Sequence, residues 1–236
     1  MLAAVKGLAD MYRAASRENH RVILDTMIPR PGATLLDLGC GPGTVTMQVA
    51  ERVGAGQVLG VELMEPLAAK ARKRGIEVTM ADLGRPLPFA DESVDVVHSN
   101  QVIEHLNDTD LFLREIRRVL RPGGYAVIST NNLSSWHNIV SLILGWQPPP
   151  CHCSDELVAG SPVSRGELAA GVDIHPMHRR IFTSKALAAV AVHHGLTVEA
   201  TRGSGYYPFP DRVSGLLARL DPRHAVYLVH RYGRPS

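Results

Sequence analysis

Short apolar runs alternate with amphipathic segments along most of the chain. Apolar runs of this length, bounded by Gly, Pro and acidic residues, predict buried strands, whereas apolar positions at helical spacing predict helices. Strands are predicted at 33–39, 57–63, 76–82, 94–100, 125–132, 196–201 and 225–233. Helices are predicted at 44–53, 66–74, 108–120, 183–194 and 211–220. This alternation indicates an α/β fold with a parallel sheet and helices on both faces.

Two segments depart from this regular pattern. Residues 1–31 have apolar side chains at helical spacing and close with Pro29 and Pro31, which predicts an N-terminal helical cap. Residues 133–182 hold one apolar helix candidate, Trp136–Gly145, then a Pro-rich turn and a Gly/Ser-rich loop. Long irregular segments in compact domains are usually functional lids or disordered. We therefore expect one domain over 1–236, with a cap at 1–31, a core at 32–132, a lid insertion at 133–182 and the remaining sheet at 183–236.

The composition fits one large soluble domain. Of the 236 residues, 45% are apolar and 20% charged, and the formal net charge is +2. The basic run Lys70–Arg74 ends a predicted helix, so a solvated last turn explains it better than a nucleic-acid patch. Three cysteines make no disulfide framework, which favours a reducing cytoplasm, and Cys151 and Cys153 have no second ligand pair for zinc. No signal peptide or membrane span is predicted, because the longest apolar run, Ile139–Trp146, is too short.

The stretch LLDLGCGPGT places glycines at alternate positions directly after a predicted strand. A dinucleotide turn needs glycine at its sixth position, where this chain has Thr44, and no Gly-Lys-Ser/Thr follows to make a phosphate loop. Glycine still lets bare backbone approach a ligand closely. The nearest charged side chain is the acid Asp37, which does not suit a polyanion.

Two further acids end neighbouring predicted strands. Glu62 can accept hydrogen bonds from both hydroxyls of a ribose, and Asp82 can accept from an adenine amino group. Strand ends of an open parallel sheet converge on one crevice. The crevice therefore suits a positively charged nucleoside without phosphate, and S-adenosylmethionine has that chemistry.

Four segments in order resemble the class I S-adenosylmethionine-dependent methyltransferases of the type 11 group, which act on small molecules. The segments are LLDLGCGPGT, GVEL, ADLGRPLPFADESVDVVHSNQVIEHL and LREIRRVLRPGGYAVIST. The glycine turn alone would be a weak signal, whereas the four segments with correct spacing are specific. The resemblance implies a Rossmann-like, doubly wound, seven-stranded and mostly parallel sheet whose last strand is antiparallel.

The resemblance also implies a set of cofactor-binding residues. Glu62 would hold the ribose, Asp82 the adenine, and Asn100 would lie beside the methionine moiety. Ordinary exposed loop acids are the alternative for Glu62 and Asp82, and Asp37 can also stabilise the turn. The implied cofactor is S-adenosyl-L-methionine, with S-adenosyl-L-homocysteine as product. The implied cofactor-binding residues are Asp37, Gly39, Gly41, Gly43, Glu62, Leu63, Asp82, Leu83 and Asn100.

Methylation of a hydroxyl or amine requires a group that takes up a proton, and a histidine suits this task. His178 lies in HPMHRRIFT, which resembles the H-x-R-x-F-T stretch at the mouth of the acceptor site in this group, with a structural hinge as the alternative. His105 is the second candidate, with packing near the cofactor as the alternative. Similar members that hold a divalent metal have a Glu before their Glu-His pair, where this chain has Gln101, so no metal is expected.

Large side chains after the fifth predicted strand suit an apolar acceptor. The predicted acceptor-binding residues are Trp136, Trp146, Arg179, Tyr206 and Tyr207. The alternative for the first segment is a helix packed on the sheet. Among the other histidines, His98 is predicted to be a satisfied core residue, while His137 and His152 rank below His178 as bases.

The leading hypothesis is a methyltransferase that acts on a small-molecule acceptor, with O-methylation in a natural-product, glycan or quinone-like pathway preferred. A nucleic-acid or protein acceptor is a second hypothesis, weakened by the absence of a basic face and of an Asn/Asp-Pro-Pro-Tyr/Phe motif after Asn100. A non-catalytic S-adenosylmethionine-binding subunit is the third. No nucleic-acid partner is expected, and a homodimer is left open.

Overall fold

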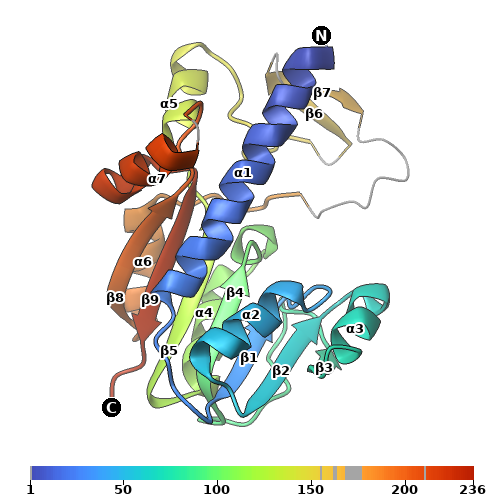
Figure 1. Cartoon of the computed structure of the whole chain (residues 1–236), viewed down its shortest axis with the longest axis vertical. Coiled ribbons are helices and arrows are strands. Elements are labelled where there is room, and N and C mark those ends of the chain that lie inside the picture. The colour runs from blue at the N-terminus through green and yellow to red at the C-terminus, as the bar shows by residue number, and fades with distance from the viewer. Residues whose placement is uncertain (1, 155, 162–163, 168–176, 210) are drawn as a thin grey trace.

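The computed structural model describes residues 2–154, 156–161, 164–167, 177–209 and 211–236. A seven-stranded sheet in the order β3-β2-β1-β4-β5-β9-β8 forms the centre of the molecule (Figure 1). β9 is antiparallel to both of its neighbours, and the remaining pairs are parallel. The predicted sheet and its antiparallel last strand are therefore confirmed. The strands are β1 (Thr34–Leu38), β2 (Gln57–Glu62), β3 (Glu77–Met80), β4 (Val94–Asn100), β5 (Leu120–Asn131), β8 (Thr197–Ser204) and β9 (Tyr227–Gly233).

Helices cover both faces of the sheet, as predicted. They are α1 (Leu2–Thr26), α2 (Thr44–Val53), α3 (Glu65–Arg72), α4 (Thr109–Val119), α5 (Trp136–Ile143), α6 (Ser184–His193) and α7 (Asp211–Leu220), with short 3-10 turns η1 (Ile103–His105) and η2 (Pro222–His224). Two helix starts have side-chain caps, because Asp108 accepts from the Leu111 amide and Thr183 accepts from the Ala186 amide.

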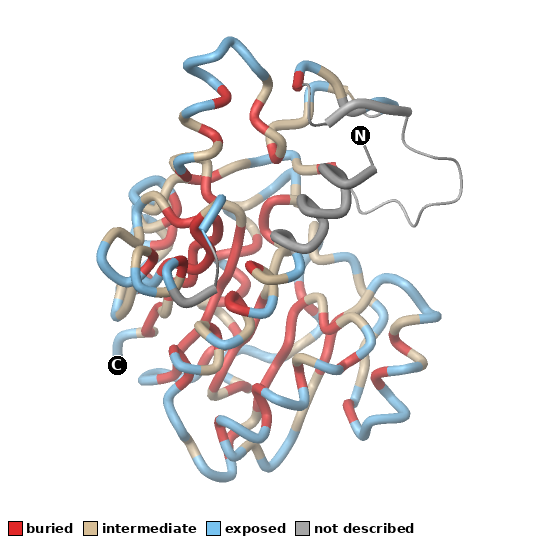
Figure 2. Tube along the Cα trace, turned by 45° about the horizontal axis from the view of Figure 1, so that its top comes forward, coloured by how far each residue is buried: buried red, intermediate tan, exposed pale blue. Residues whose placement is uncertain are grey.

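The sheet is buried on both faces, which explains its nearly continuous apolar strands. The largest core cluster contains Leu113 and Ile116 of α4 and Leu187 of α6, and a second one contains Ile23 of α1 and Val49 of α2. Figure 2 shows the buried positions concentrated along the central strands. Burial on both sides fixes the strand register, so the carboxyl ends of β1, β2 and β4 are held at one edge.

The segment after β5 lies beyond that edge of the sheet (Figure 1). It contains α5 and a two-stranded antiparallel hairpin of β6 (Leu157–Ser161) and β7 (Ser164–Glu167). The sequence predicted the helix and missed the hairpin, since these strands have little apolar alternation. Within the described residues, no helix has the length and apolar character needed to cross a membrane.

Candidate functional site

The three glycines of the turn after β1 all have left-handed backbone, with φ of 81° at Gly39, 52° at Gly41 and 80° at Gly43. A Cβ on Gly39 would lie 2.5 Å from a methyl carbon of Val102, and a Cβ on Gly43 would lie 2.5 Å from Ile76 Cδ1. A Cβ on Gly41 would meet nothing within 4 Å. The turn is therefore packed tightly at its two ends and leaves bare backbone open to a ligand at its middle.

The carboxylate of Glu62 lies at the end of β2 beside this turn. Its Oε2 accepts a hydrogen bond of 2.9 Å from the Gly41 amide, and its Oε1 accepts from the amides of Leu63 and Met64, both at 2.9 Å. Three backbone donors fix the orientation of the carboxylate without neutralising it. Oε1 already accepts two bonds, whereas Oε2 accepts one and can accept another. The Gly41 amide, which could otherwise donate to a phosphate, donates to the Glu62 carboxylate instead. This arrangement agrees with a cationic ligand.

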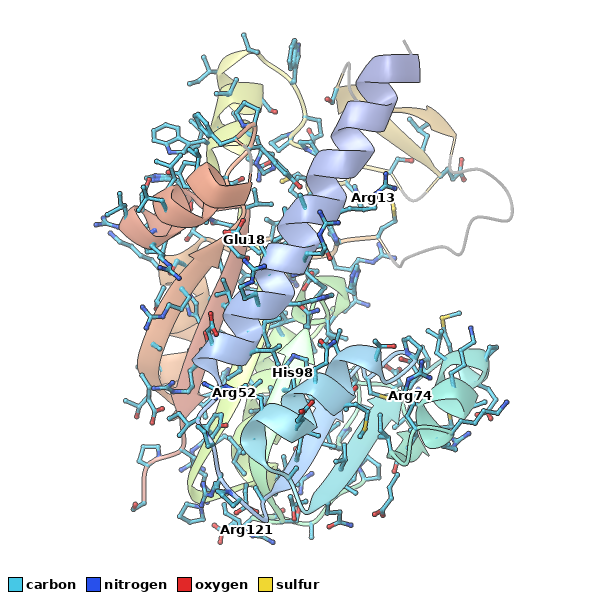
Figure 3. All side chains as sticks on the ribbon, in the orientation of Figure 1. Arg13, Glu18, Arg52, Arg74, His98 and Arg121 are labelled. Carbon is cyan, nitrogen blue, oxygen red and sulfur yellow. The ribbon has the colours of Figure 1, made fainter. Side chains whose placement is uncertain are left out.

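Asp37 lies inside the protein, with 2% of its surface exposed. Its Oδ2 accepts from the Thr46 hydroxyl at 2.6 Å, and its Oδ1 is 2.8 Å from Nδ1 of His98. Asp37 thus links β1, β4 and α2 behind the glycine turn, which supports a role through the turn rather than a direct contact with the ligand. His98, labelled in Figure 3, is buried, as predicted. The prediction that it is satisfied is wrong for one ring nitrogen, because Nε2 has no hydrogen-bond partner among the described residues.

The third predicted acid, Asp82, follows β3. Its Oδ1 accepts from the Gly84 amide at 2.8 Å, an Asx-type turn that holds the loop, and about half of its side chain is exposed. Leu83 packs against the larger core cluster, while Leu63 is 67% exposed beside Glu62. The exposed apolar side chain of Leu63, next to Glu62 in the chain, suits the flat face of a nucleobase.

Asn100, at the end of β4, is tied to the N-terminal helix. Its Oδ1 accepts from the Asn19 amide group at 3.1 Å, and Asn19 in turn accepts from the hydroxyls of Ser129 and Ser204, at 3.1 and 2.9 Å. Asn19 is 2% exposed. No sequence pattern points to Asn19, because a single Asn in a helical pattern does not reveal which strands it faces. The residue after Asn100, Gln101, has φ of 57°, and strained backbone of this kind is frequent at functional sites.

Glu104 is fully buried, and burial raises its pKa to about 7. Its Oε2 accepts from the Thr130 hydroxyl at 2.8 Å, and its Oε1 accepts from Asn131 at 3.3 Å. Its backbone carbonyl accepts from the amides of Arg179 and Arg180, at 2.6 and 3.0 Å. The backbone of residue 104 therefore attaches the segment that contains His178 to the end of β4.

His178 lies at the centre of three neighbouring imidazole rings. Its ring centroid is 4.9 Å from that of His105 and 4.8 Å from that of His152, with which it is stacked. Its Nδ1 is 2.9 Å from the Pro150 carbonyl, which can only accept, so in the neutral ring the proton is on Nδ1 and the lone pair on Nε2. The lone pair faces the Asn131 amide at 3.4 Å. This is the tautomer that a general base at Nε2 requires.

The structure thus brings together the two histidines predicted as catalytic and adds His152, which the sequence ranked low. Glu104, His105 and His178 have ligand atoms within 4.8 Å of one another, and among the described residues they alone form a group that could hold a metal ion. Gln101, whose Oε1 accepts from Asn131 at 3.1 Å, stands beside this group as a neutral side chain.

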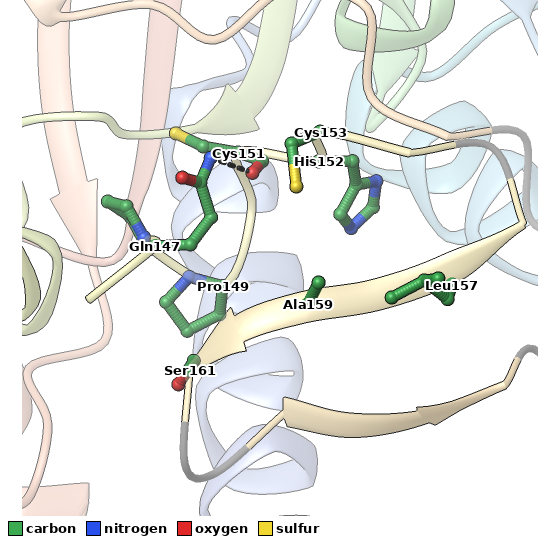
Figure 4. A pocket seen from close by; sticks show the side chains of 9 residues that line it. Gln147, Pro149, Cys151, His152, Cys153, Leu157, Ala159 and Ser161 are labelled. Carbon is green, nitrogen blue, oxygen red and sulfur yellow. Dashed lines mark hydrogen bonds between the residues drawn. The ribbon is translucent and has the colours of Figure 1, made fainter.

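A small pocket beside His152 is lined by the two cysteines of the lid (Figure 4). Its volume is about 10 Å³, which is room for a water molecule and not for an organic acceptor. Burial raises the pKa of the Cys151 thiol, which keeps it protonated and a poor metal ligand. Cys151 and Cys153 belong to no group of potential metal ligands among the described residues.

The aromatic residues predicted to bind the acceptor differ in their surroundings. Trp136 Nε1 donates to the Tyr206 hydroxyl at 2.8 Å, and that hydroxyl donates to Asp221 at 2.6 Å. Tyr206 is 7% exposed, so it holds α5 against η2 and offers little surface to an acceptor. Trp146 is partly exposed and Tyr207 packs against His137, with ring centroids 5.2 Å apart. Arg179 is exposed beside His178.

Comparison with known proteins agrees with this architecture. A family model described as "Methyltransferase domain" matches residues 36–128. A ubiquinone biosynthesis O-methyltransferase from Agrobacterium fabrum is 32% identical over 161 residues, which cover 64% of this chain and 63% of that protein. Nocamycin O-methyltransferase from Saccharothrix syringae is 38% identical over 129 residues, which cover 50% of this chain and 46% of that protein.

The fold has solved counterparts. A crystal structure of an S-adenosylmethionine-dependent methyltransferase from Mesorhizobium loti aligns with a TM-score of 0.64 and 21% identity, over 95% of this chain and 100% of that chain. This chain spans less than two thirds of the length of the curated relatives that it matches here.

The sheet order and the match of residues 36–128 to a methyltransferase domain define an α/β protein with the fold of a methyltransferase. More particularly, both findings agree with the resemblance to class I S-adenosylmethionine-dependent methyltransferases that the sequence implied.

Proposed function

We propose that this chain transfers a methyl group from S-adenosylmethionine to a hydroxyl of a small molecule. The observation that carries the proposal is the Glu62 carboxylate, held by three backbone amides beside the open middle of the glycine turn. Free thiols at Cys40, Cys151 and Cys153 support the cytoplasm as its location.

The residues present fit this cofactor. The open side of Gly41 admits a ligand against bare backbone, and Oε2 of Glu62 has acceptor capacity left for a ribose hydroxyl. Leu63 and Leu83 offer apolar surface near the acid Asp82, which suits an adenine and its amino group. Asn100, held by Asn19, would lie beside the methionine part. When bound, the cofactor supplies a methyl group on a positively charged sulfur that leaves readily.

The acceptor needs a group that removes its proton, and His178 has the required form. Its Nδ1 is committed to the Pro150 carbonyl, so Nε2 can take a proton from a hydroxyl as the new bond forms. His105 and His152 pack on the ring and limit its rotation. The backbone bonds from Arg179 and Arg180 to Glu104 fix the distance between this base and the end of β4. Positioning of this kind supplies much of the rate enhancement.

The O-methyltransferase names of two relatives support oxygen as the target atom. Exposed apolar side chains of the lid, including Trp146, Leu142 and Leu144, support a ring-shaped or lipid-like acceptor. We retain the proposal that no metal takes part, because the neutral Gln101 stands at the place of an anionic ligand. Treatment with EDTA tests this point: loss of activity that Mg²⁺ or Zn²⁺ restores would contradict it.

Calorimetric titration of S-adenosylmethionine tests the cofactor site. We expect wild-type binding, and Glu62→Ala should weaken it by about 100-fold, because charge-assisted hydrogen bonds to the ribose are lost. Glu77→Ala, which removes an exposed acid at the start of β3, is the matched control and should change the affinity less than twofold. Equal affinity in the two variants would overturn the site. A screen with labelled cofactor over phenols, sugars and polyketide-like rings then tests the acceptor class.

A further inference from the structure

A groove of about 740 Å³ lies between α1, β8 and α7. Four arginines line it: Arg17 and Arg21 from α1, Arg202 from β8 and Arg219 from α7. All four are exposed. Three elements far apart in the sequence therefore bring guanidinium groups to one concave surface.

These guanidinium groups have no ion pair or hydrogen bond within the described part of the chain, in contrast to other arginines of the molecule. Arg118 and Arg231, for example, form ion pairs with carboxylates at 2.7 and 2.9 Å. The chain has 25 basic and 23 acidic residues, so a general excess of positive charge does not explain the difference.

Two acids also line the groove, and they compensate half of its positive charge. Glu18 is buried on the side of α1 that faces α7 (Figure 3), where it accepts from the Ser214 hydroxyl at 2.9 Å. Asp25 is exposed one turn beyond Arg21. Four positive and two negative groups give the lining a formal charge of +2.

Repulsion between the arginines of this groove destabilises the folded protein when no anion neutralises them. Arg17 and Arg21 are one helical turn apart, and like charges at this spacing destabilise a helix by a few tenths of a kcal/mol. A concave surface concentrates the potential of its charges, which attracts anions. The planar guanidinium group matches two oxygens of a phosphate at once, so several arginines in one groove favour a ligand with more than one phosphate.

The size of the groove favours a small molecule. Its volume lies inside the range of about 300–1,000 Å³ that is usual for small-molecule sites. The groove is separate from the proposed catalytic site. α1 forms one wall of the groove, whereas Asn19 on the same helix bonds to Asn100 at the proposed catalytic site. The two sites would thus share one helix and no lining residue named here.

We propose that the Arg17–Arg21–Arg202–Arg219 groove is a binding site for a small organic molecule that carries two or more phosphate groups. The site is separate from the cofactor crevice, and the proposal does not depend on the methyltransferase activity.

Titration calorimetry with inorganic diphosphate, at 50 mM and 300 mM NaCl, tests the proposal. Wild-type protein should bind diphosphate at least tenfold more tightly than orthophosphate, and more weakly at the higher salt concentration. The double variant Arg202→Gln/Arg219→Gln should lose at least tenfold in affinity. Arg202→Lys/Arg219→Lys, which keeps the charge and loses the planar fork, should fall between the two. Arg74→Gln, on the far side of the molecule beside α3 (Figure 3), is the matched control and should bind like wild type.

S-adenosylmethionine affinity and the thermal midpoint, measured in parallel, should stay unchanged in the double variants, which separates this site from the cofactor crevice. If a double variant fails to fold, the single variants Arg202→Lys and Arg219→Lys are used in its place. Equal diphosphate affinity in wild type and groove variants would overturn the proposal. Wild-type protein that binds orthophosphate as tightly as diphosphate would also overturn the proposal. So would a single-stranded oligonucleotide that binds more tightly than diphosphate and whose binding the same substitutions abolish.

Discussion

The cofactor side and the acceptor side of the crevice are built in different ways. On the cofactor side, a run of consecutive residues supplies the turn, and its acid Glu62 is held by amides of its own neighbours and of Gly41. On the acceptor side, the histidines and Glu104 come from three separate segments, and the base is oriented by the carbonyl of Pro150. The proposed donor side is thus built mainly on backbone groups, whereas the proposed acceptor side is assembled from side chains of separate segments.

This difference explains why relatives with one donor can serve many acceptors. A backbone-built site changes little when side chains change, while a site assembled from several loops changes with each of them. The named relatives match the chain over roughly half of its length or somewhat more. The methyltransferase-domain match, residues 36–128, includes the turn. The predictions below test whether the two sides can be disabled separately.

The largest expected effect is on the acceptor side. His178→Ala should lower kcat by about 10²- to 10⁴-fold, because the proton of the acceptor hydroxyl loses its base. The affinity for S-adenosylmethionine, measured by calorimetry, should stay within threefold.

His152→Ala is the control for this substitution, since it removes the stacked neighbour and leaves the base in place. We expect a loss of tenfold or less. If His178→Ala has the same kcat as wild type, His178 is not the base.

Substitution of two glycines with the same backbone conformation should separate folding from binding on the cofactor side. Gly39→Ala places a Cβ against Val102 and should cost about 3 kcal/mol in the free energy of unfolding, from strain and overpacking together. Gly41→Ala meets no neighbour and should cost about 1 kcal/mol, from strain alone. Urea unfolding measures both.

Gly41→Ala should nevertheless weaken S-adenosylmethionine binding at least tenfold, because the added methyl group projects into the open side of the turn. Unchanged affinity in this folded variant would contradict the proposed approach of the ligand to the turn.

Burial of Glu104 predicts a pH-dependent cost. Its pKa is about 7 in the folded protein, above the ordinary value of 4.5, so the folded state keeps a proton that the unfolded state has released. Stability from this group therefore falls as pH rises from about 4.5 to 7, by up to about 3 kcal/mol.

Glu104→Gln removes this dependence and keeps an oxygen for Thr130. Buried His137 and His230, whose pKa values fall to about 4, change stability in the opposite direction, so the informative quantity is variant minus wild type. That difference, from urea unfolding at pH 5 and pH 7.5, should increase with pH. A flat difference would show that the carboxyl group is not desolvated.

The smallest effect is expected in the lid. Trp136→Phe removes the hydrogen bond to Tyr206 and should cost about 1 kcal/mol in unfolding free energy. Trp146→Phe, at a partly exposed ring, is the matched control and should cost less than 0.5 kcal/mol. Equal losses would mean that the Trp136 bond does not hold α5.

The fold was predictable because buried parallel strands and amphipathic helices leave periodic signals. Helix 44–53 and strand 94–100 have the predicted bounds, and Thr183 caps the helix it was predicted to start. The hairpin of β6 and β7 was missed, because a polar, Gly-containing strand outside the core has no burial pattern to read. Residue His175 of the HPMHRRIFT stretch lies outside the described residues.

The candidate site was predictable where its residues are close in sequence. The glycine turn and the strand-end acids could be placed because strand ends converge. Asn19 and His152 could not be placed, since their partners Asn100 and His178 lie 81 and 26 residues away. The engagement of Asp37 with His98 was equally hidden, as both fall in strands whose pairing register the sequence does not state.

The two amides that bond to the Glu104 carbonyl have a consequence for how this protein can diversify. Both donors and the acceptor are main-chain atoms, so the junction does not depend on which side chains stand at 179 and 180. Substitutions at 179 and 180 can change the side chains that face a new acceptor. The spacing between the proposed base and the methyl donor then stays the same. Evolution can therefore vary selectivity at this junction without first rebuilding the catalytic frame.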